Sequence, residues 1–265
     1  MNSIIMISKN INSIKYLQFT NLSEFGNLIH FSTTRQSGKS KGMLSSFNLG
    51  YTVNDNPQFV TENLDSLANI FGISRKQMVS PKQSHTKNIG IVKSENDLFN
   101  DTDALITNIP NICIFVRTAD CIPILLYDPV KKAAAAIHSG WKSTLQEISK
   151  HTIELMQKEY GTNPKDLIAG VGPSIGPEVY EVGPEVIEQF LNYFDFDNYI
   201  TPIKNSEKGF LNLWEVNKQI LINSGIPGNQ IEIAEMCTYS NPELFYSARR
   251  DGVKTGRLAT GIMIK

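Results

Sequence analysis

The clearest helical pattern in the chain follows a proline. Asn56 offers a side-chain cap and Pro57 suits the first position of a helix, and apolar residues then recur every three to four positions until Gly72. Short apolar runs without this period fill the middle of the chain, as is typical of buried strands. These runs cover residues 112–116, 122–127 and 133–137. The pattern predicts one amphipathic helix followed by a group of buried strands.

Strands and helices continue to alternate over the second half of the chain. Apolar runs predict further strands at residues 167–171, 231–236 and 258–264. Helical spacing predicts helices from 142 to about 161, over 184–193 and over 213–224. Because helices and hairpin-like turns are intermingled, we expect an α/β (α+β) fold with mixed β-sheets flanked by helices. No repeat or linker composition divides the chain, which favours a single layered domain over residues 1–265.

Composition narrows the classes of function. The 25 Lys and Arg residues nearly balance 26 Asp and Glu, so the net charge of -1 gives no broad field for nucleic acid or an anionic membrane. No apolar run approaches the roughly 20 residues of a membrane-spanning helix, and residues 1–12 lack a basic leader. An odd number of cysteines, Cys113, Cys121 and Cys237, does not suit a disulfide framework. We therefore expect a cytoplasmic protein with no nucleic-acid or membrane partner.

Two of the four histidines stand in polar segments at the ends of predicted strands. His85 ends the string Gln83-Ser84-His85, and His138 opens the string His138-Ser139-Gly140-Trp141. Cys121 follows Asp120 between two predicted strands, a position that packing alone explains poorly. Two imidazoles and one thiolate, with a fourth position left to water, are typical of a catalytic zinc site. The spacing matches no zinc-finger motif, so ordinary loop histidines and a buried cysteine remain the alternative interpretation.

Eight polar motifs occur in order along the chain. They are Phe31-Ser32-Thr33-Thr34-Arg35, Phe47-Asn48-Leu49-Gly50, Gln83-Ser84-His85, Thr102-Asp103-Ala104-Leu105, Thr118-Ala119-Asp120-Cys121-Ile122-Pro123, Ala136-Ile137-His138-Ser139-Gly140-Trp141-Lys142, Gly172-Pro173-Ser174-Ile175-Gly176-Pro177 and Ser247-Ala248-Arg249-Arg250-Asp251-Gly252. Together they resemble the YfiH/YlmD family, from about Phe31 to Ile264. Proteins of that family have been described as laccase-like polyphenol oxidases and later as purine nucleoside phosphorylases with adenosine deaminase activity.

The resemblance implies a YfiH-like fold and a zinc site made by His85, Cys121 and His138. It also implies phosphorolysis of adenosine, inosine, guanosine or S-methyl-5'-thioadenosine to the base and ribose 1-phosphate. The partners would be a purine nucleoside and phosphate, and the oligomeric state stays open. The residues implied to line the same pocket are Arg35, Asn48, Asp103 and Arg249 or Arg250. Lys142 stands where the family more often has arginine, which keeps the charge but loses the bidentate fork.

Phosphorolysis and deamination ask different things of these residues. Phosphate beside the sugar calls for cations and an amide, and Arg35, Arg249, Lys142 and Asn48 are of the right types. Deamination calls for activated water and a proton shuttle, for which Asp103 or Asp120 is suited. The sequence does not decide between these reactions.

Other functions use the same three residues. A His2Cys set also suits copper and phenol oxidation, although four histidines are too few for a four-copper laccase. Cys121 with His138 as its base would instead form an amide hydrolase that edits peptidoglycan precursors. A metal-stabilised binding module without turnover would have a closed site with four ligands. Metal content distinguishes these alternatives.

Overall fold

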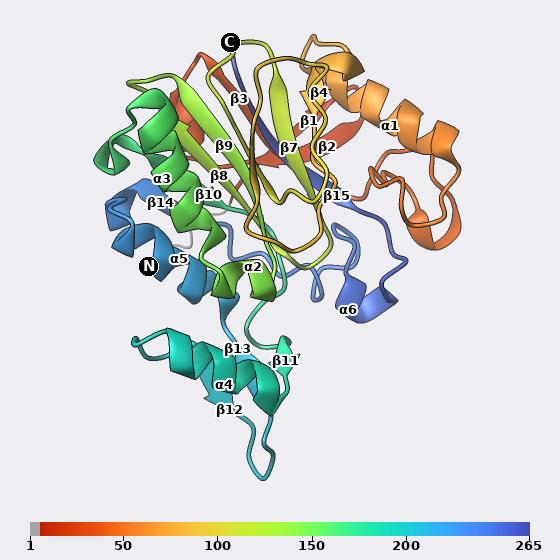
Figure 1. Ribbon diagram of the computed structural model, residues 1–265. Helices are drawn as coiled ribbons and strands as arrows, with labels where there is room; N and C mark the ends of the chain where they lie inside the picture. Colours follow the sequence, from red (N-terminus) through yellow and green to blue (C-terminus); the bar gives the residue numbers. More distant parts are fainter. Residues whose placement is uncertain (1–5) are drawn as a thin grey trace.

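Two six-stranded sheets form the centre of the molecule, which the computed structural model describes over residues 6–265 (Figure 1). The strands of the first sheet are β1 Ile7–Ile11, β2 Ile14–Gln18, β3 Leu28–Thr33, β4 Met78–Val79, β7 Cys113–Thr118 and β15 Leu258–Ile264. The strands of the second are β5 Ile89–Ile91, β6 Ala104–Thr107, β8 Ile122–Asp128, β9 Ala133–Ser139, β10 Ile168–Val171 and β14 Ile231–Ile233. Residues 1–5, part of the N-terminal segment expected to lack a leader, lie outside the described residues.

Both sheets are mixed. Their strand orders are β1-β2-β3-β15-β7-β4 and β14-β10-β8-β9-β6-β5. Strand β4 runs parallel to β7, β5 parallel to β6 and β14 parallel to β10, while the other neighbours are antiparallel. The prediction of an α/β fold with mixed sheets flanked by helices is confirmed.

The sheets are covered on both faces, which explains the continuous apolar runs of the sequence. Strands β7 and β15 pack against β9, so that Val116, Ala136 and Ile262 lie in a shared core between the sheets. Helix α1, Pro57–Ile70, covers the outer face of the first sheet. Helices α3, Ile148–Tyr160, and α5, Leu213–Asn223, cover the outer face of the second. A strand buried on both faces carries apolar side chains at every position instead of at alternate ones.

Two helices follow β9 where the sequence predicts one. Helix α1 begins as expected, because the Asn56 side chain accepts a hydrogen bond from the backbone N–H of Gln58 at 2.9 Å. After β9, however, α2 covers only Trp141–Leu145 and α3 begins at Ile148. Glu147 between them has a φ of 50°, and a residue with positive φ cannot continue a right-handed helix. The apolar spacing is nearly continuous across this break and therefore conceals it.

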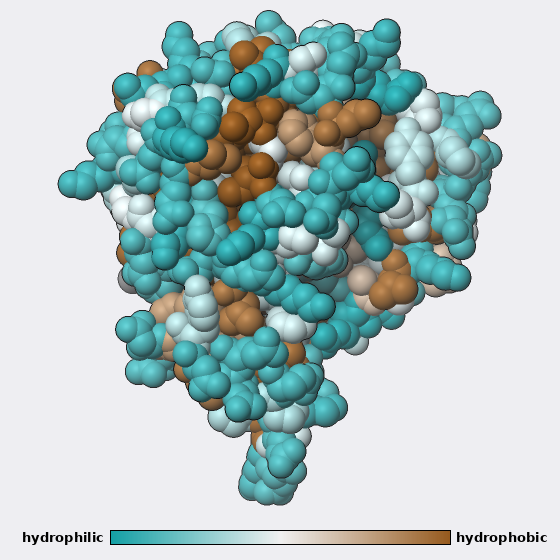
Figure 2. Space-filling view, in the orientation of Figure 1, coloured by the Kyte–Doolittle hydropathy of each residue, from teal (hydrophilic) through white to brown (hydrophobic). Residues whose placement is uncertain are grey.

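A small lobe stands out below the sheets in Figure 1. It consists of β11 Glu181–Val182, α4 Pro184–Tyr193, β12 Ile200–Pro202 and β13 Gly209–Leu211. Phe190 and Leu211 of the lobe belong to the same buried cluster as Val216 of α5. Figure 2 shows the same lobe below a mainly hydrophilic face whose apolar side chains gather in its upper middle.

A last short helix, α6 Ala248–Asp251, precedes β15. Within residues 6–265, no helix combines the length and the apolar character that crossing a membrane requires. The single domain over residues 1–265 stays a prediction.

Candidate metal centre and its cavities

Three side chains converge from separate parts of the chain. His85 lies between β4 and β5, Cys121 lies between β7 and β8, and His138 lies within β9. The antiparallel pairing of β8 with β9 places Pro123 opposite His138 and so brings Cys121 to the same edge. The potential ligand atoms of the three residues all lie within 4.8 Å of one another, and Cys121 Sγ is 3.7 Å from His85 Nε2. Within residues 6–265 this is the one such group of His, Cys, Asp and Glu side chains.

Asp103 holds both histidine-bearing segments. Its Oδ1 accepts a hydrogen bond from His138 Nδ1 at 2.7 Å. Its Oδ2 accepts hydrogen bonds from the backbone N–H of Thr86 at 2.7 Å, from that of Ser84 at 3.2 Å and from the Thr86 hydroxyl at 3.0 Å. His85, with a φ of 63°, lies between these two residues. The proton on His138 Nδ1 leaves the Nε2 lone pair available to a metal.

Cys121 and His138 stabilise each other's charged forms in the metal-free centre. Burial opposes the charge of His138, but the Cys121 thiolate and Asp103 raise its pKa to about 9, so a metal ion that binds Nε2 replaces a proton there. Burial opposes ionisation of the Cys121 thiol, but the imidazolium of His138 and hydrogen bonds from His138 and His85 outweigh it and lower the pKa to about 6. Burial likewise opposes ionisation of Asp103, while hydrogen bonds from His138, Thr86 and Ser84 lower its pKa to about 2. The thiolate is the form of cysteine that binds metal, and the ionised Asp103 can only accept hydrogen bonds.

The separation of two of the donors fits a small divalent metal ion. Bonds of about 2.3 Å to sulfur and about 2.1 Å to nitrogen, at a tetrahedral angle, place the two donors about 3.6 Å apart. The observed separation of 3.7 Å between Cys121 Sγ and His85 Nε2 is close to this value. Gly140 is required by the same close packing, because a Cβ there would lie 2.8 Å from His85 Cδ2 and 3.1 Å from Cys121 Sγ.

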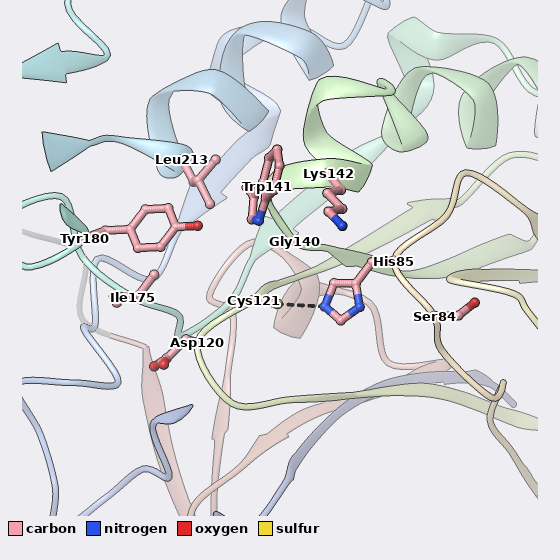
Figure 3. Close-up of a pocket in the computed structure, with 10 residues that line it drawn as sticks. All are labelled: Ser84, His85, Asp120, Cys121, Gly140, Trp141, Lys142, Ile175, Tyr180 and Leu213. Carbon is pink, nitrogen blue, oxygen red and sulfur yellow. Dashed lines mark hydrogen bonds between the residues drawn. The ribbon is translucent and has the colours of Figure 1, made fainter. Parts of the chain in front are cut away.

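Two cavities meet at this centre, and both are lined by His85 and Cys121. The small cavity has a volume of about 310 Å³ and an apolar wall with polar groups around it. Figure 3 shows its wall of Trp141, Ile175, Tyr180 and Leu213 on one side of the His85–Cys121 pair. Its remaining lining residues are Ser84, Asp120, Gly140 and Lys142.

The large cavity has a volume of about 590 Å³ and also reaches His138. Its basic lining residues are Lys82, Arg117 and Arg257. The other residues that line it are Gly50, Tyr51, Thr52, Ser80, Pro81, Gln83, Leu98, Phe99, Asn100, Thr118, Ala119, Ala248 and Val253. A metal at the three donors would therefore face two differently lined spaces.

Lys142 and Arg249 lie at or beside the small cavity. Lys142 lines it, with its ammonium 5.5 Å from the ring centre of Trp141. The Arg249 guanidinium lies 5.1 Å from the ring centre of Tyr180 and donates to the Glu181 carbonyl at 2.9 Å. Arg249 thus borders the cavity through Tyr180.

Arg35, Asn48 and Arg250 line neither cavity, which differs from the expectation. The Arg35 guanidinium donates to three backbone carbonyls and stacks on Tyr246 at 4.5 Å. The Asn48 side chain is fully buried and bonds to Gly50, Asp55 and the backbone N–H of Arg257. The Arg250 guanidinium bonds to three carbonyls and to Asp251. Their polar groups hold loops together and are already engaged.

Asp120 also has a supporting position. Its carboxylate accepts hydrogen bonds from the Thr238 hydroxyl at 2.6 Å, the Ser247 hydroxyl at 3.0 Å and the backbone N–H of Arg249 at 2.7 Å. Asp120 has a φ of 91° and immediately precedes Cys121. These contacts fix the loop that presents the thiolate, whereas Asp103 is engaged with the histidines.

Sequence reasoning missed Arg117 and Arg257 of the large cavity. The signal for Arg117 was a charge at the end of an otherwise apolar run, directly before Thr118. Arg257 gave no comparable signal, because it lies outside the eight motifs.

Comparison with known proteins decides the family. A family model described as "Multi-copper polyphenol oxidoreductase laccase" matches residues 29–265. This chain belongs to that family. It is 37% identical, over 94% of its length and 96% of the relative's, to "Purine nucleoside phosphorylase" of Bacteroides thetaiotaomicron. It is 31% identical, over 89% of its length and 93% of the relative's, to "Adenosine deaminase RL5" of an unknown prokaryotic organism.

A solved structure agrees with this assignment. The structure of the hypothetical protein YfiH from Bacillus licheniformis matches with a TM-score of 0.88 and 31% identity, covering 96% of this chain and 100% of that one. The family recognised from the eight motifs is confirmed, and so is the prediction of an enzyme.

The family description names several coppers, but the described residues offer one three-donor group. The two remaining histidines are used elsewhere. His30 is buried in the first sheet, with its ring beside the Phe19 carbonyl, and His151 pairs with Glu154 on α3. One metal centre per chain is what residues 6–265 of this member of the laccase-like family support.

Proposed function

We propose that this enzyme is a zinc-dependent purine nucleoside phosphorylase with adenosine deaminase as a second activity. The observation that carries the proposal is the convergence of His85, Cys121 and His138 where two cavities meet. Relatives of 37% and 31% identity, named for these two activities, support it. Bound zinc in such a three-ligand site supplies a Lewis acid or an activated water.

The two cavities suit the two parts of a nucleoside reaction. The small cavity, with the rings of Trp141 and Tyr180, offers an apolar surface on which a purine can pack. The basic large cavity offers cations for phosphate beside the sugar. In phosphorolysis the bond from the ribose C1' to the purine nitrogen breaks and a bond from C1' to a phosphate oxygen forms. The base leaves with the electron pair and takes up a proton.

Residues around the three donors hold them in place for this reaction. Asp103 fixes the ring of His138 and the backbone on both sides of His85. Asp120 anchors the loop of Cys121 through Thr238 and Ser247. Lys142 places a positive charge on the wall of the small cavity, where it balances an anion or a partial charge on the base.

A cysteine hydrolase is the second candidate. In such an enzyme Cys121 would be the nucleophile, His138 its base and Asp103 the carboxylate that orients the base. The lowered pKa of Cys121 and the hydrogen bond between His138 and Asp103 both suit that use. His85, 3.7 Å from the sulfur, favours the metal centre, since a nucleophile needs no second imidazole. A copper oxidase shares the donor set and is distinguished by its metal.

Metal analysis together with a nucleoside panel tests the proposal. Protein purified without added metal should contain about one zinc per chain. It should convert adenosine, inosine, guanosine or S-methyl-5'-thioadenosine to free base and a sugar 1-phosphate only when phosphate is present. Turnover of adenosine to inosine alone, without phosphate, would establish deamination and reject phosphorolysis. Stoichiometric copper with a visible thiolate charge-transfer band would reject zinc, and full activity of metal-free protein would favour the cysteine hydrolase.

A further inference from the structure

The charge of the large cavity is unbalanced. Lys82, Arg117 and Arg257 line it, and among its lining residues within 6–265 there is no aspartate or glutamate. The small cavity, by contrast, has Asp120 as well as Lys142. The three cations outnumber the single thiolate of Cys121, and an excess of one sign around a low-dielectric space raises the local concentration of ligands of the opposite sign. The large cavity therefore favours an anion.

Arg117 carries the least compensated of these charges. Its Nε donates to the Leu49 carbonyl at 2.6 Å and its Nη1 to the Ser80 hydroxyl at 2.5 Å, and the guanidinium lies 4.7 Å from the ring centre of Phe115. No carboxylate among residues 6–265 pairs with it. Burial lowers the pKa of Arg117 to about 10, so the side chain stays charged at neutral pH. A charge withdrawn from water without a counter-ion is costly unless a ligand supplies one.

The fold holds this guanidinium in a fixed place. Besides the two hydrogen bonds of the guanidinium, the Gln83 side chain holds the Arg117 backbone. It accepts from the Arg117 N–H at 2.8 Å and donates to the Arg117 carbonyl at 2.7 Å. Nη2 of Arg117 is left without a hydrogen-bond partner in the described part of the chain.

We infer that Arg117 forms an oxyanion subsite of the large cavity that binds a phosphate group. A fixed guanidinium with free N–H donors matches the oxygens of phosphate. The inference rests on the proposed function in so far as inorganic phosphate is the co-substrate. A nucleoside 5'-monophosphate presents the same chemistry, and the experiment separates the two sources.

The test measures binding without turnover. Inorganic phosphate alone is titrated into the zinc-loaded full-length protein by calorimetry, for wild type, Arg117→Met, Arg117→Lys and the control Arg75→Met. Arg75 pairs with Asp65 on the surface and lines neither cavity. We expect Arg117→Met to weaken phosphate binding at least about tenfold, Arg117→Lys to weaken it less and Arg75→Met to leave it unchanged.

Thermal stability separates a binding role from a structural one. Without phosphate, Arg117→Met should melt close to wild type, because the removal of an uncompensated charge offsets the loss of the bonds to the Leu49 carbonyl and the Ser80 hydroxyl. A phosphate affinity of Arg117→Met equal to that of wild type would overturn the inference. If Arg117→Met does not fold, Arg117→Lys decides by the same titration, and wild-type phosphate affinity in that variant overturns the inference.

Further arms distinguish this inference from the proposed function. Adenosine 5'-monophosphate is titrated in parallel with phosphate. If only the nucleotide binds, and does so through Arg117, the subsite stands and phosphorolysis fails. If phosphate binds through Arg117 but no nucleoside is cleaved, the subsite again stands without the proposed activity. If nucleosides are cleaved and the KM for phosphate is the same in Arg117→Met, the subsite is overturned and the proposed function stands.

Discussion

Replacing Asp103 by asparagine should weaken metal binding by reversing the ring tautomer of His138. Three donors, the Ser84 and Thr86 backbone N–H groups and the Thr86 hydroxyl, point at Oδ2 of Asp103. The amide oxygen of the introduced side chain must occupy that position, which turns the amide nitrogen toward His138. An NH2 group cannot accept a hydrogen bond, so Nδ1 of His138 must become the acceptor and its proton must move to Nε2. The protonated Nε2 then has no lone pair for zinc.

The magnitude follows from the loss of an orienting carboxylate. Removing such a partner of a metal-bound histidine typically costs 10- to 100-fold in affinity, or roughly 1.4 to 2.7 kcal/mol. Zinc affinity is measured by competition with a chromophoric chelator at neutral pH, and the melting temperature of the metal-free protein is recorded beside it. We expect the lower affinity in a protein that still folds, because three of the four hydrogen bonds at this side chain persist and the fourth re-forms with its direction reversed.

Asp128→Asn is the matched control. Asp128 is a fully buried carboxylate that accepts backbone N–H bonds from Val130 and Lys131 and touches none of the three donors. It should change stability without changing zinc affinity. The tautomer argument is refuted if Asp103→Asn binds zinc within about twofold of wild type, or if both substitutions weaken zinc equally.

Three further outcomes follow from the site. In metal-free protein, iodoacetamide should modify Cys121 at a rate that rises as the pH passes about 6, the pKa of its thiol. Burial raises the pKa of Cys113 to about 12, so Cys113 should stay unmodified in the folded state. Mass spectrometry of the peptides measures the modification of both residues. Gly140→Ala should remove zinc, while Gly26→Ala, whose Cβ meets nothing within 4 Å, retains it, and equal zinc content in the two would contradict the crowding seen at the centre. Asn48→Ala should lower the free energy of unfolding by about 1 to 3 kcal/mol, measured with denaturant, because the side chain holds loops together. It should leave the nucleoside KM unchanged, because Asn48 lines neither cavity. A raised KM at unchanged stability would instead support a substrate-binding role for Asn48.

The fold was predictable where local pattern and burial coincide. Helix α1 has its cap, its proline and its apolar stripe within one segment, and strands β7 to β9 are apolar at nearly every position because both faces are covered. Strand β1 escaped notice because four of its five residues are exposed, and its partner β2 follows a turn at Asn12 and Ser13 without glycine. The break at Glu147 is a backbone feature that apolar spacing does not reveal.

The candidate site divides along similar lines. His85, Cys121 and His138 were found because their chemistry stands out in polar strings at strand ends. The residues that surround these three were not found, because tertiary contacts decide which partners a polar side chain has. The Arg35 guanidinium donates to backbone carbonyls, one of them in the distant residue Pro242. The Arg117 guanidinium, which follows an apolar run in the sequence, keeps N–H donors free. Residue type alone cannot separate these two arginines.

The position of β15 bears on how the protein matures during synthesis. This strand, Leu258–Ile264, lies between β3 and β7 and provides both of them with their pairing edge. The first sheet therefore cannot close on the ribosome until the segment around residue 264 has emerged, long after Cys121 and His138. Until then the edges of β3 and β7 are open to wrong pairing, as is common for strands that wait for a distant partner. The loop of Cys121 follows β7 directly, so the pocket around the three donors should be completed only after β15 has paired with β7.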